Sequence, residues 1–247
     1  MRSGIVAFVL AFLALAANAQ TENDTAHIGL TNSSRLLKEG DLVFVQSHTE
    51  NAAQITQVTG SRLTHCGIVF GSSEGWVVFE GAGQPEFRSL EKWQKEEADG
   101  HVEPVYVHRL KNRDEILTAD KLKSLRDEAS KLHKTNYDFA FAWNNSYVEN
   151  RGRRDEVTKE YVYCSELLYK AFERALGLRL GTPHAIKDYY AGLPEQDADK
   201  IKAKLKDDPR AQRCRNGNAF NPEDPAISPV EVFASELLED VKNETAH

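Results

Sequence analysis

A cysteine at the start of the most regular helical pattern is the residue best suited to chemistry in this 247-residue sequence. Apolar residues follow Cys164 at helical spacing and predict an amphipathic helix over Cys164–Leu178. The macrodipole and the free N–H groups of a first helical turn favour a thiolate and could stabilise an oxyanion. Cys164 is therefore a candidate nucleophile. The alternative is a structural cysteine, because free cysteines are among the most often buried residues.

One histidine stands out as a base for this thiol. His65 lies inside the apolar run Leu63–Phe70, where an ionisable ring is costly unless a partner compensates it. The period of two along a strand places Cys66 on the opposite face, and Gly67 leaves room beside the imidazole. We therefore expect His65 to act as the general base.

The next predicted strand supplies a carboxylate. Glu80 follows the apolar run Trp76–Phe79 and is the only carboxylate there. A hairpin that pairs Phe70 with Gly75 would place Glu80 directly opposite His65, so that the two side chains touch. A carboxylate there would orient the imidazole. The alternative is a solvated strand-end carboxylate.

The surrounding pattern predicts a single α+β domain beginning near residue 40. Four apolar runs predict strands, at Leu42–Val45, Leu63–Phe70, Trp76–Phe79 and Val102–Leu110. Helical spacing predicts helices at Asn51–Thr59, around Leu122–Leu132, at Cys164–Leu178 and from a capping box at Ser228-Pro229-Val230-Glu231 through Leu238. Residues 144–160 predict an exposed insertion, and residues 197–213 predict a surface helix or loop.

Several separated segments resemble the YaeF/YiiX branch of the NlpC-type cysteine enzymes. The segments are Gly40-Asp41-Leu42-Val43-Phe44, Thr64-His65-Cys66-Gly67-Ile68-Val69, Glu80, Tyr137-Asp138-Phe139, Tyr161-Val162-Tyr163-Cys164-Ser165-Glu166-Leu167 and Ser228-Pro229. The resemblance covers about residues 40–238. It implies a circularly permuted papain-like fold, in which an antiparallel sheet packs on the helix that carries the catalytic cysteine and the histidine precedes that cysteine.

The resemblance also implies roles for individual residues. Cys164 would be the nucleophile, His65 the general base and Glu80 the group that orients it. Tyr163, Gln46 and Arg151 are further candidates for substrate contacts. Arg151 lies in an arginine cluster that could hold a carboxylate, although such clusters are more often solvated loops.

Two features depart from the family pattern. Cys66 stands where the family usually has a plain apolar residue, and the segment 144–160 is longer than expected. The three cysteines, Cys66, Cys164 and Cys214, allow either three free thiols or one bridge with one free thiol. A Cys66–Cys214 bridge is one possibility in an oxidising compartment.

Composition excludes several classes of protein. A net charge of −7 offers no basic face overall for the phosphate backbone, which argues against a nucleic acid partner. A mean hydropathy of −0.53 excludes a multispanning membrane protein. Neither His-Glu-x-x-His nor paired Cys-x-x-Cys spacing occurs, so we expect no metal and no cofactor.

The first nineteen residues predict a signal peptide. Arg2, the apolar run Ile5–Leu15 and the small residues of Ala17-Asn18-Ala19 fit its three regions, and the run is too short to span a bilayer. The alternative is an uncleaved anchor. We expect export to a periplasm or to the outside, no membrane span after cleavage, an N-terminal segment at 20–39 and one catalytic domain at 40–247.

Three functions fit these residues. The leading one is an exported cysteine amidase or peptidase that cleaves small amides, such as cell-wall peptides, through a thioester. The second is a lipid acyl hydrolase or an acyltransferase of the lecithin:retinol acyltransferase type. An apolar, open groove beside Cys164 would favour the second, and a small polar or charged pocket would count against it. The third is a non-catalytic binding protein on the same scaffold.

Overall fold

The computed structural model of this chain describes residues 36–47, 50–97, 105–143, 145–150 and 156–241. The predicted signal peptide at 1–19 and Arg151 lie outside these residues. Among the helices within them, none has both the length and the apolar character needed to cross a membrane.

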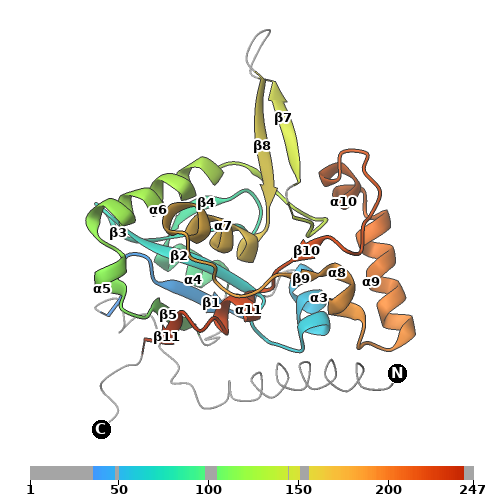
Figure 1. The fold of residues 1–247 in the computed structure, drawn as a ribbon, viewed down its shortest axis with the longest axis horizontal. Helices are drawn as coiled ribbons and strands as arrows, with labels where there is room; N and C mark the ends of the chain where they lie inside the picture. Colours follow the sequence, from blue (N-terminus) through green and yellow to red (C-terminus); the bar gives the residue numbers. More distant parts are fainter. Residues whose placement is uncertain (1–35, 48–49, 98–104, 144, 151–155, 242–247) are drawn as a thin grey trace.

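A six-stranded antiparallel sheet forms the centre of the molecule (Figure 1). In order across the sheet, its strands are β11 (Leu238–Asp240), β5 (Tyr106–Leu110), β1 (Leu42–Val45), β2 (His65–Ser72), β3 (Gly75–Glu80) and β4 (Glu86–Ser89). The central strands β1 and β2 are buried along most of their length, as their continuous apolar runs predict.

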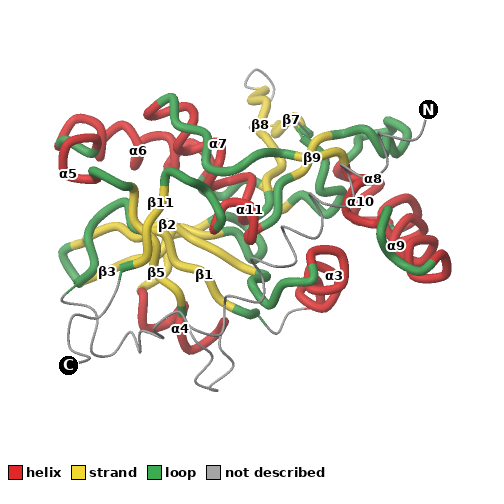
Figure 2. Tube along the Cα trace, turned by 60° about the horizontal axis from the view of Figure 1, so that its bottom comes forward, coloured by secondary structure: helices red, strands yellow, loops and turns green. Residues whose placement is uncertain are grey.

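Helices cover both faces of this sheet (Figure 2). On one face, α6 (Ala119–Leu132) and α7 (Cys164–Leu176) form the larger core with the alternate residues Cys66, Ile68 and Phe70 of β2. On the other face, α4 (Leu90–Glu97) buries Trp93 against Val69 and Val78. The predicted α+β fold, with an antiparallel sheet packed on the helix that begins at Cys164, is confirmed.

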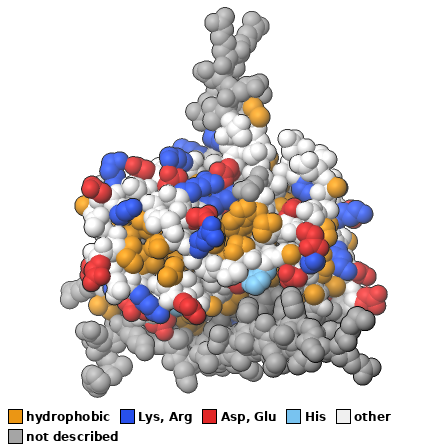
Figure 3. Space-filling model, in the orientation of Figure 1, with side chains coloured by type: hydrophobic (Ala, Val, Ile, Leu, Met, Phe, Trp, Pro, Cys, Tyr) orange, Lys and Arg blue, Asp and Glu red, His pale blue; other side chains and the backbone are white. Residues whose placement is uncertain are grey.

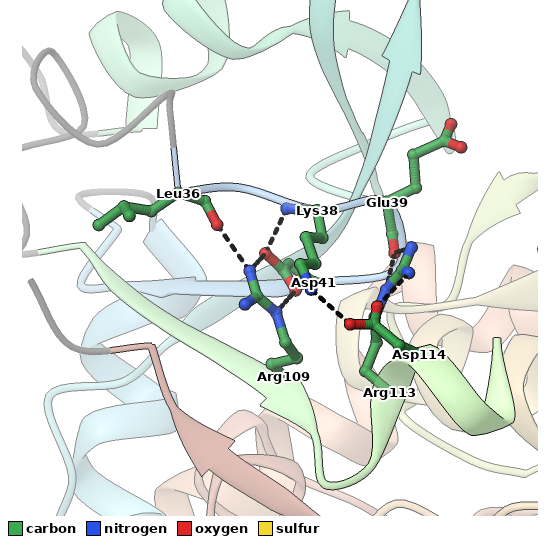
Figure 4. Close-up of polar contacts among 7 residues, drawn as sticks. All are labelled: Leu36, Lys38, Glu39, Asp41, Arg109, Arg113 and Asp114. Carbon is green, nitrogen blue, oxygen red and sulfur yellow. Dashed lines mark hydrogen bonds and ion pairs between the residues drawn. The ribbon is translucent and has the colours of Figure 1, made fainter.

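A buried carboxylate, Asp41, holds the start of β1 in place (Figure 4). Asp41 is fully buried and accepts two hydrogen bonds of 2.7 Å from Arg109 on β5 and one from the Lys38 backbone. Arg109 also donates to the carbonyl of Leu36. Gly40, with φ of 86°, forms the predicted turn immediately before. These contacts fix β1 next to β2, which carries His65.

The described residues of the segment 144–160 include two antiparallel strands that project from the body (Figure 1). The strands are β7 (Ser146–Asn150) and β8 (Glu156–Val162), and β8 also pairs in parallel with β6 (Asn136–Tyr137), so these three strands form a second sheet. Val148 is half exposed on it. The sequence predicts an exposed insertion here, and its described residues form paired strands.

Further helices and short strands complete the described part of the chain. They are α3 (Glu50–Thr59), α5 (Arg113–Ile116), β9 (His184–Ala185), α8 (Ile186–Tyr190), α9 (Glu195–Asp207), α10 (Pro209–Cys214), β10 (Pro225–Ala226) and α11 (Pro229–Phe233). The capping box predicted at Ser228 and Glu231 is present at the start of α11. The prediction that this helix reaches Leu238 was wrong, because the chain leaves the helix to pair Leu238 with Leu110 at the sheet edge.

Acidic and basic side chains intermingle on the face drawn in Figure 3, with apolar patches between them. Many of these charges pair within one helix turn, as Lys123 does with Asp127 and Lys202 with Asp199. The surface on this face therefore carries both positive and negative side chains, which are exposed to solvent.

Candidate active site

Cys164 is the first residue of α7, where the sequence predicts it. The preceding residue, Tyr163, is extended and caps the helix without a side-chain hydrogen bond, so first-turn N–H groups stay free of intrahelical partners. Leu167 and Leu168 are fully buried on the inner face, and Gly177 ends the helix in the left-handed conformation. The thiol is 3% exposed and lines a pocket, so it is sheltered yet reachable.

His65 meets this thiol at the end of the sheet. It is the first residue of β2, it is buried, and its side chain is hydrogen-bonded to that of Cys164. Its Nε2 lies 2.9 Å from Oε2 of Glu80, which leaves Nδ1 as the nitrogen available to the thiol. The three residues proposed from the sequence are therefore brought together in one chain of contacts.

The register that brings Glu80 to His65 differs from the expected one. The strands β2 and β3 continue to Ser72 and Gly75, which pair, so the turn holds two residues rather than four. Glu80 consequently lies opposite Gly67, and not opposite His65. A shift of two residues keeps a side chain on its face, and the carboxylate reaches His65 diagonally.

Gly67 makes this approach possible. A Cβ at this position would lie 2.4 Å from Cγ1 of Val78, 3.1 Å from the carbonyl oxygen of Phe79 and 3.2 Å from Cβ of Glu80. No side chain other than hydrogen fits there without displacing the strand that carries Glu80.

The surroundings of Glu80 favour its ionised form. Burial raises the pKa of this carboxyl group, but the hydrogen bond and charge of His65 and the charge of Arg88 outweigh burial and lower the pKa below its usual value. Oε1 of Glu80 lies 2.6 Å from Nη2 of Arg88 on β4. Sequence reasoning missed Arg88, because the four-residue strand Glu86–Ser89 has too little pattern to be recognised.

The surroundings of Cys164 favour its thiolate form. The hydrogen bond from Cys66 is the largest influence and lowers the pKa of Cys164, burial raises it, and the hydrogen bond and charge of His65 lower it further, so the pKa lies well below its usual value. Burial raises the pKa of Cys66 well above its usual value, so this thiol stays protonated and donates. Cys66 and His65 point to opposite faces of β2, and Cys164 lies over the start of the strand, where both reach it.

All three cysteines are free thiols. The possible Cys66–Cys214 bridge is not formed: Cys66 belongs to the core around α7, whereas Cys214 packs in a separate cluster and its thiol donates to the carbonyl of Tyr137 at 3.5 Å. Cys66 is therefore a second thiol at the site, hydrogen-bonded to the candidate nucleophile.

Replacing Cys66 with valine should make Cys164 less reactive in weak acid. The substitution keeps an apolar side chain of similar size but removes the donor, and a hydrogen bond to a charged group contributes about 1.5 kcal/mol, or roughly tenfold. We expect alkylation of Cys164 by iodoacetamide, followed by peptide mass spectrometry, to slow by about that factor below neutrality. Cys214→Ala should leave the rate unchanged, and an unchanged rate in Cys66→Val would refute this contribution.

Tyr137 is a second residue whose place the sequence did not reveal. It is buried, its hydroxyl group is hydrogen-bonded to Asn51 on α3, and Cys164 is near enough for burial and this neighbouring charge to raise the pKa of the phenol well above its usual value. The hydroxyl therefore stays protonated and can donate a hydrogen bond close to the nucleophile.

An apolar pocket opens beside Cys164, with a volume of about 710 Å³ including its open mouth. Its walls come from α3, from the residues before α7, from α8 and α9, and from the loop into α11. The lining residues are Asn51, Gln54, Ile55, Val58, Thr59, Phe141, Tyr163, Cys164, Ser165, Ile186, Tyr189, Tyr190, Ile201, Leu205, Ala226, Ile227, Ser228 and Pro229. Within the described part of the chain, none of them carries an acidic, basic or imidazole side chain.

The structure separates the three candidates for substrate contacts. Tyr163 lines the pocket, and its hydroxyl accepts a hydrogen bond of 2.9 Å from the Ile227 N–H. Gln46 is not among the lining residues, and its side-chain oxygen accepts from Nε of Arg62 at 2.7 Å. Arg151 lies outside the described residues. The segment 197–213, expected only at the surface, contributes Ile201 and Leu205 to the pocket wall.

Comparisons with known proteins agree with this arrangement. The model of the family described as "Permuted papain-like amidase enzyme, YaeF/YiiX, C92 family" matches residues 36–241. The chain is 25% identical over 205 residues to the uncharacterized protein YiiX of Escherichia coli (strain K12), covering 83% of this chain and 86% of that protein. A crystal structure titled "metalloprotein yiiX", from Escherichia coli O157:H7, superposes with a TM-score of 0.63 at 23% identity, covering 84% of this chain and 97% of that one.

The word metalloprotein in that title applies to the E. coli protein. Among the residues described here, no three His, Cys, Asp or Glu side chains come together as ligands for a metal ion. The family match spans most of the chain, and the fold agrees with it. This chain belongs to the YaeF/YiiX family of permuted papain-like amidases.

Proposed function

We propose that this protein is a cysteine hydrolase that cleaves an amide or related acyl bond whose acyl part is apolar. Membership of the amidase family supports a cysteine hydrolase in general. The observation that supports an apolar acyl part is the apolar pocket that opens directly onto Cys164.

The proposed reaction begins with the Cys164 thiolate and the His65 imidazolium. The thiolate attacks the carbonyl carbon, and the oxyanion forms beside the free N–H groups of the first turn of α7. The imidazolium gives its proton to the leaving amine as the carbon–nitrogen bond breaks, which leaves a thioester on Cys164. Water, deprotonated by His65, then attacks the thioester and releases the carboxylic acid and the free thiol.

The pocket supports an apolar acyl group in preference to a cell-wall peptide. Its described lining carries no charged side chain, so an amino or carboxylate group of a muropeptide would lose its hydration there without gaining an ionic partner. An apolar acyl chain makes no hydrogen bonds with water that it would lose in the pocket. Each CH₂ group that it buries contributes about 0.8 kcal/mol to the free energy of binding. The cell-wall substrate expected from the sequence is therefore the weaker proposal.

The same pocket favours acyl transfer as a second function. A thioester formed in an apolar site can pass its acyl group to an alcohol or amine instead of water. The two outcomes differ only in the acceptor, so adding a small primary alcohol to the assay and measuring the ratio of ester to free acid separates them.

Chain-length preference tests the proposed function. We expect kcat/KM for p-nitroanilides and p-nitrophenyl esters to rise from acetyl to myristoyl substrates. Ile55→Trp should fill the pocket from α3 and lower kcat/KM for myristoyl substrates by about tenfold, with little effect on acetyl ones. Gln57→Trp is the matched control, because Gln57 is exposed on the same helix and does not line the pocket.

Each alternative outcome has its own meaning. Equal rates on substrates of all chain lengths, unaffected by Ile55→Trp, would refute the proposal that the pocket binds the acyl chain. The proposal of a cysteine hydrolase would remain. Saturable binding of a fluorescent fatty acid, without turnover of any substrate and without labelling of Cys164 by an acyl probe, would instead indicate the non-catalytic binding protein.

A further inference from the structure

The carboxylate of Glu80 is held from two sides. Oε2 lies 2.9 Å from Nε2 of His65, and Oε1 lies 2.6 Å from Nη2 of Arg88. The Glu80 side chain is fully buried and that of Arg88 is 12% exposed. Because the pair is sheltered, salt screens it little and the charge of Arg88 acts strongly on the carboxylate.

The register of β3 and β4 explains why an arginine is needed here. Glu86 stands directly opposite Glu80, and Arg88 stands opposite Val78 on the same face. Two carboxylates opposite each other on neighbouring strands repel. Nη2 of Arg88 also lies 3.2 Å from Oε1 of Glu86, so one guanidinium group bridges both acids.

Other ionisable groups around Glu80 are few. His65 faces it from β2, Glu86 and Arg88 face it from β4, and Cys164 acts on it through His65. Cys66 points to the opposite face of β2, where burial raises its pKa and the charge of Glu80 is near enough to raise it further. The helix α4, which packs against β3 and β4, presents the buried indole of Trp93 and keeps Glu91 and Lys92 exposed. The Ala82 N–H also donates to the Glu80 carboxylate.

Only one of the two cationic partners of Glu80 keeps its charge during the proposed reaction. His65 gains and loses a proton in each half of the cycle, whereas a guanidinium group stays protonated at any working pH. While His65 is neutral, a buried carboxylate without another cation would take up a proton and could no longer stabilise the next imidazolium. Arg88 supplies that permanent cation.

We propose that Arg88 is a positioning residue of this site, which acts through Glu80 by keeping the carboxylate ionised and directed at His65 throughout the cycle. The inference rests on the proposed Cys164–His65 chemistry. Arg88 touches neither the thiol nor the pocket, so its effect passes entirely through Glu80.

The test measures the pH dependence of Cys164 alkylation by iodoacetamide, which needs no substrate. In Arg88→Gln, we expect the rate at about pH 6 to fall by about tenfold or more, and the rates of variant and wild type to converge at about pH 9. Arg88→Lys should recover most of the rate, because it restores the cation. A pH profile of folded Arg88→Gln that superimposes on the wild-type profile would overturn the proposal.

Two matched controls separate this role from a structural one. Arg109→Gln removes another arginine from a buried ion pair of the same sheet, with Asp41, and should lower the melting temperature without moving the pH profile. Glu86→Gln removes the second acid bound by Arg88 and should also leave the profile in place. A shift of equal size in Arg109→Gln would refute a specific effect of Arg88.

A double variant keeps the test decisive if Arg88→Gln fails to fold. Glu80→Gln/Arg88→Gln removes the buried carboxylate together with its cation, and its profile should match that of Glu80→Gln alone. A further shift beyond Glu80→Gln would mean that Arg88 acts by another route. Wild-type Cys164 that alkylates as an ordinary thiol would instead refute the proposed function itself, so the two failures are distinguishable.

Discussion

Cys164→Ala is expected to abolish hydrolysis of acyl p-nitroanilides and p-nitrophenyl esters while leaving the protein folded. The substitution removes the atom that forms the thioester, and loss of a covalent nucleophile lowers kcat by at least about a thousandfold. Alanine fits the first turn of α7 without disturbing the buried residues Leu167 and Leu168. Steady-state rates on a short and a long substrate measure the effect.

Binding should survive the same substitution. Binding of an acyl chain to the proposed pocket would depend on its apolar walls on α3, α8 and α9, so we expect Cys164→Ala to bind a fluorescent fatty acid with a Kd within about twofold of wild type. Cys214→Ala, which removes a buried thiol from a different cluster, should keep full activity. Substantial turnover by Cys164→Ala would remove this residue as the nucleophile.

Gly67→Ala is expected to damage both stability and activity. The added Cβ would come within 2.4 Å of Val78 and press on Glu80, so β3 must move away from β2. Overpacking in a buried sheet costs about 2 kcal/mol, and the movement separates Glu80 from His65. We expect a lower melting temperature and a kcat/KM reduced by roughly a hundredfold.

Gly71→Ala is the matched control on the same strand. Its Cβ would meet only the flexible end of Glu39, at 3.3 Å, so both stability and kcat/KM should stay near wild type. If Gly67→Ala kept wild-type activity and melting temperature, close packing of β3 on Gly67 would not be what brings Glu80 to His65.

Local pattern was enough to predict the elements that carry the site. Apolar residues at i+3, i+4, i+7 and i+8 from Cys164 predict the buried face of α7, and the capping box at Ser228 predicts the start of α11. Both patterns span only one or two helix turns, and such local patterns determine where a helix forms and which face it buries without information from distant residues.

The hairpin register was beyond such local reasoning. Ser72 and Gly75 both join the ladder, with the Ser72 hydroxyl donating to the Gly75 carbonyl at 2.8 Å and Gly75 at φ of 117°. The same glycine and serine residues are equally compatible with a turn of four residues, so the sequence does not distinguish the two registers. The contact between His65 and Glu80 was nevertheless anticipated, because an error of two residues preserves the face of a strand.

Partners that come from weak or distant elements could not be predicted. Arg88 lies on a strand of four residues, and Ile201 and Leu205 stand among the charges of α9. Their spacing of four is an amphipathic signal, but it does not say what the apolar side covers. That information depends on the packing of α9 beside α3 and α8 across the mouth of the pocket.

The order of the site residues along the chain has a consequence for biosynthesis. His65 and Glu80 belong to one short hairpin, whereas Cys164 arrives on a helix much later in the sequence. Hairpin contacts are local and form early, and the docking of α7 on β2 is a long-range event that completes folding. We therefore expect the nascent polypeptide to form the contact between His65 and Glu80 first, and the proposed nucleophile to reach its thiolate-favouring surroundings only when the domain is complete.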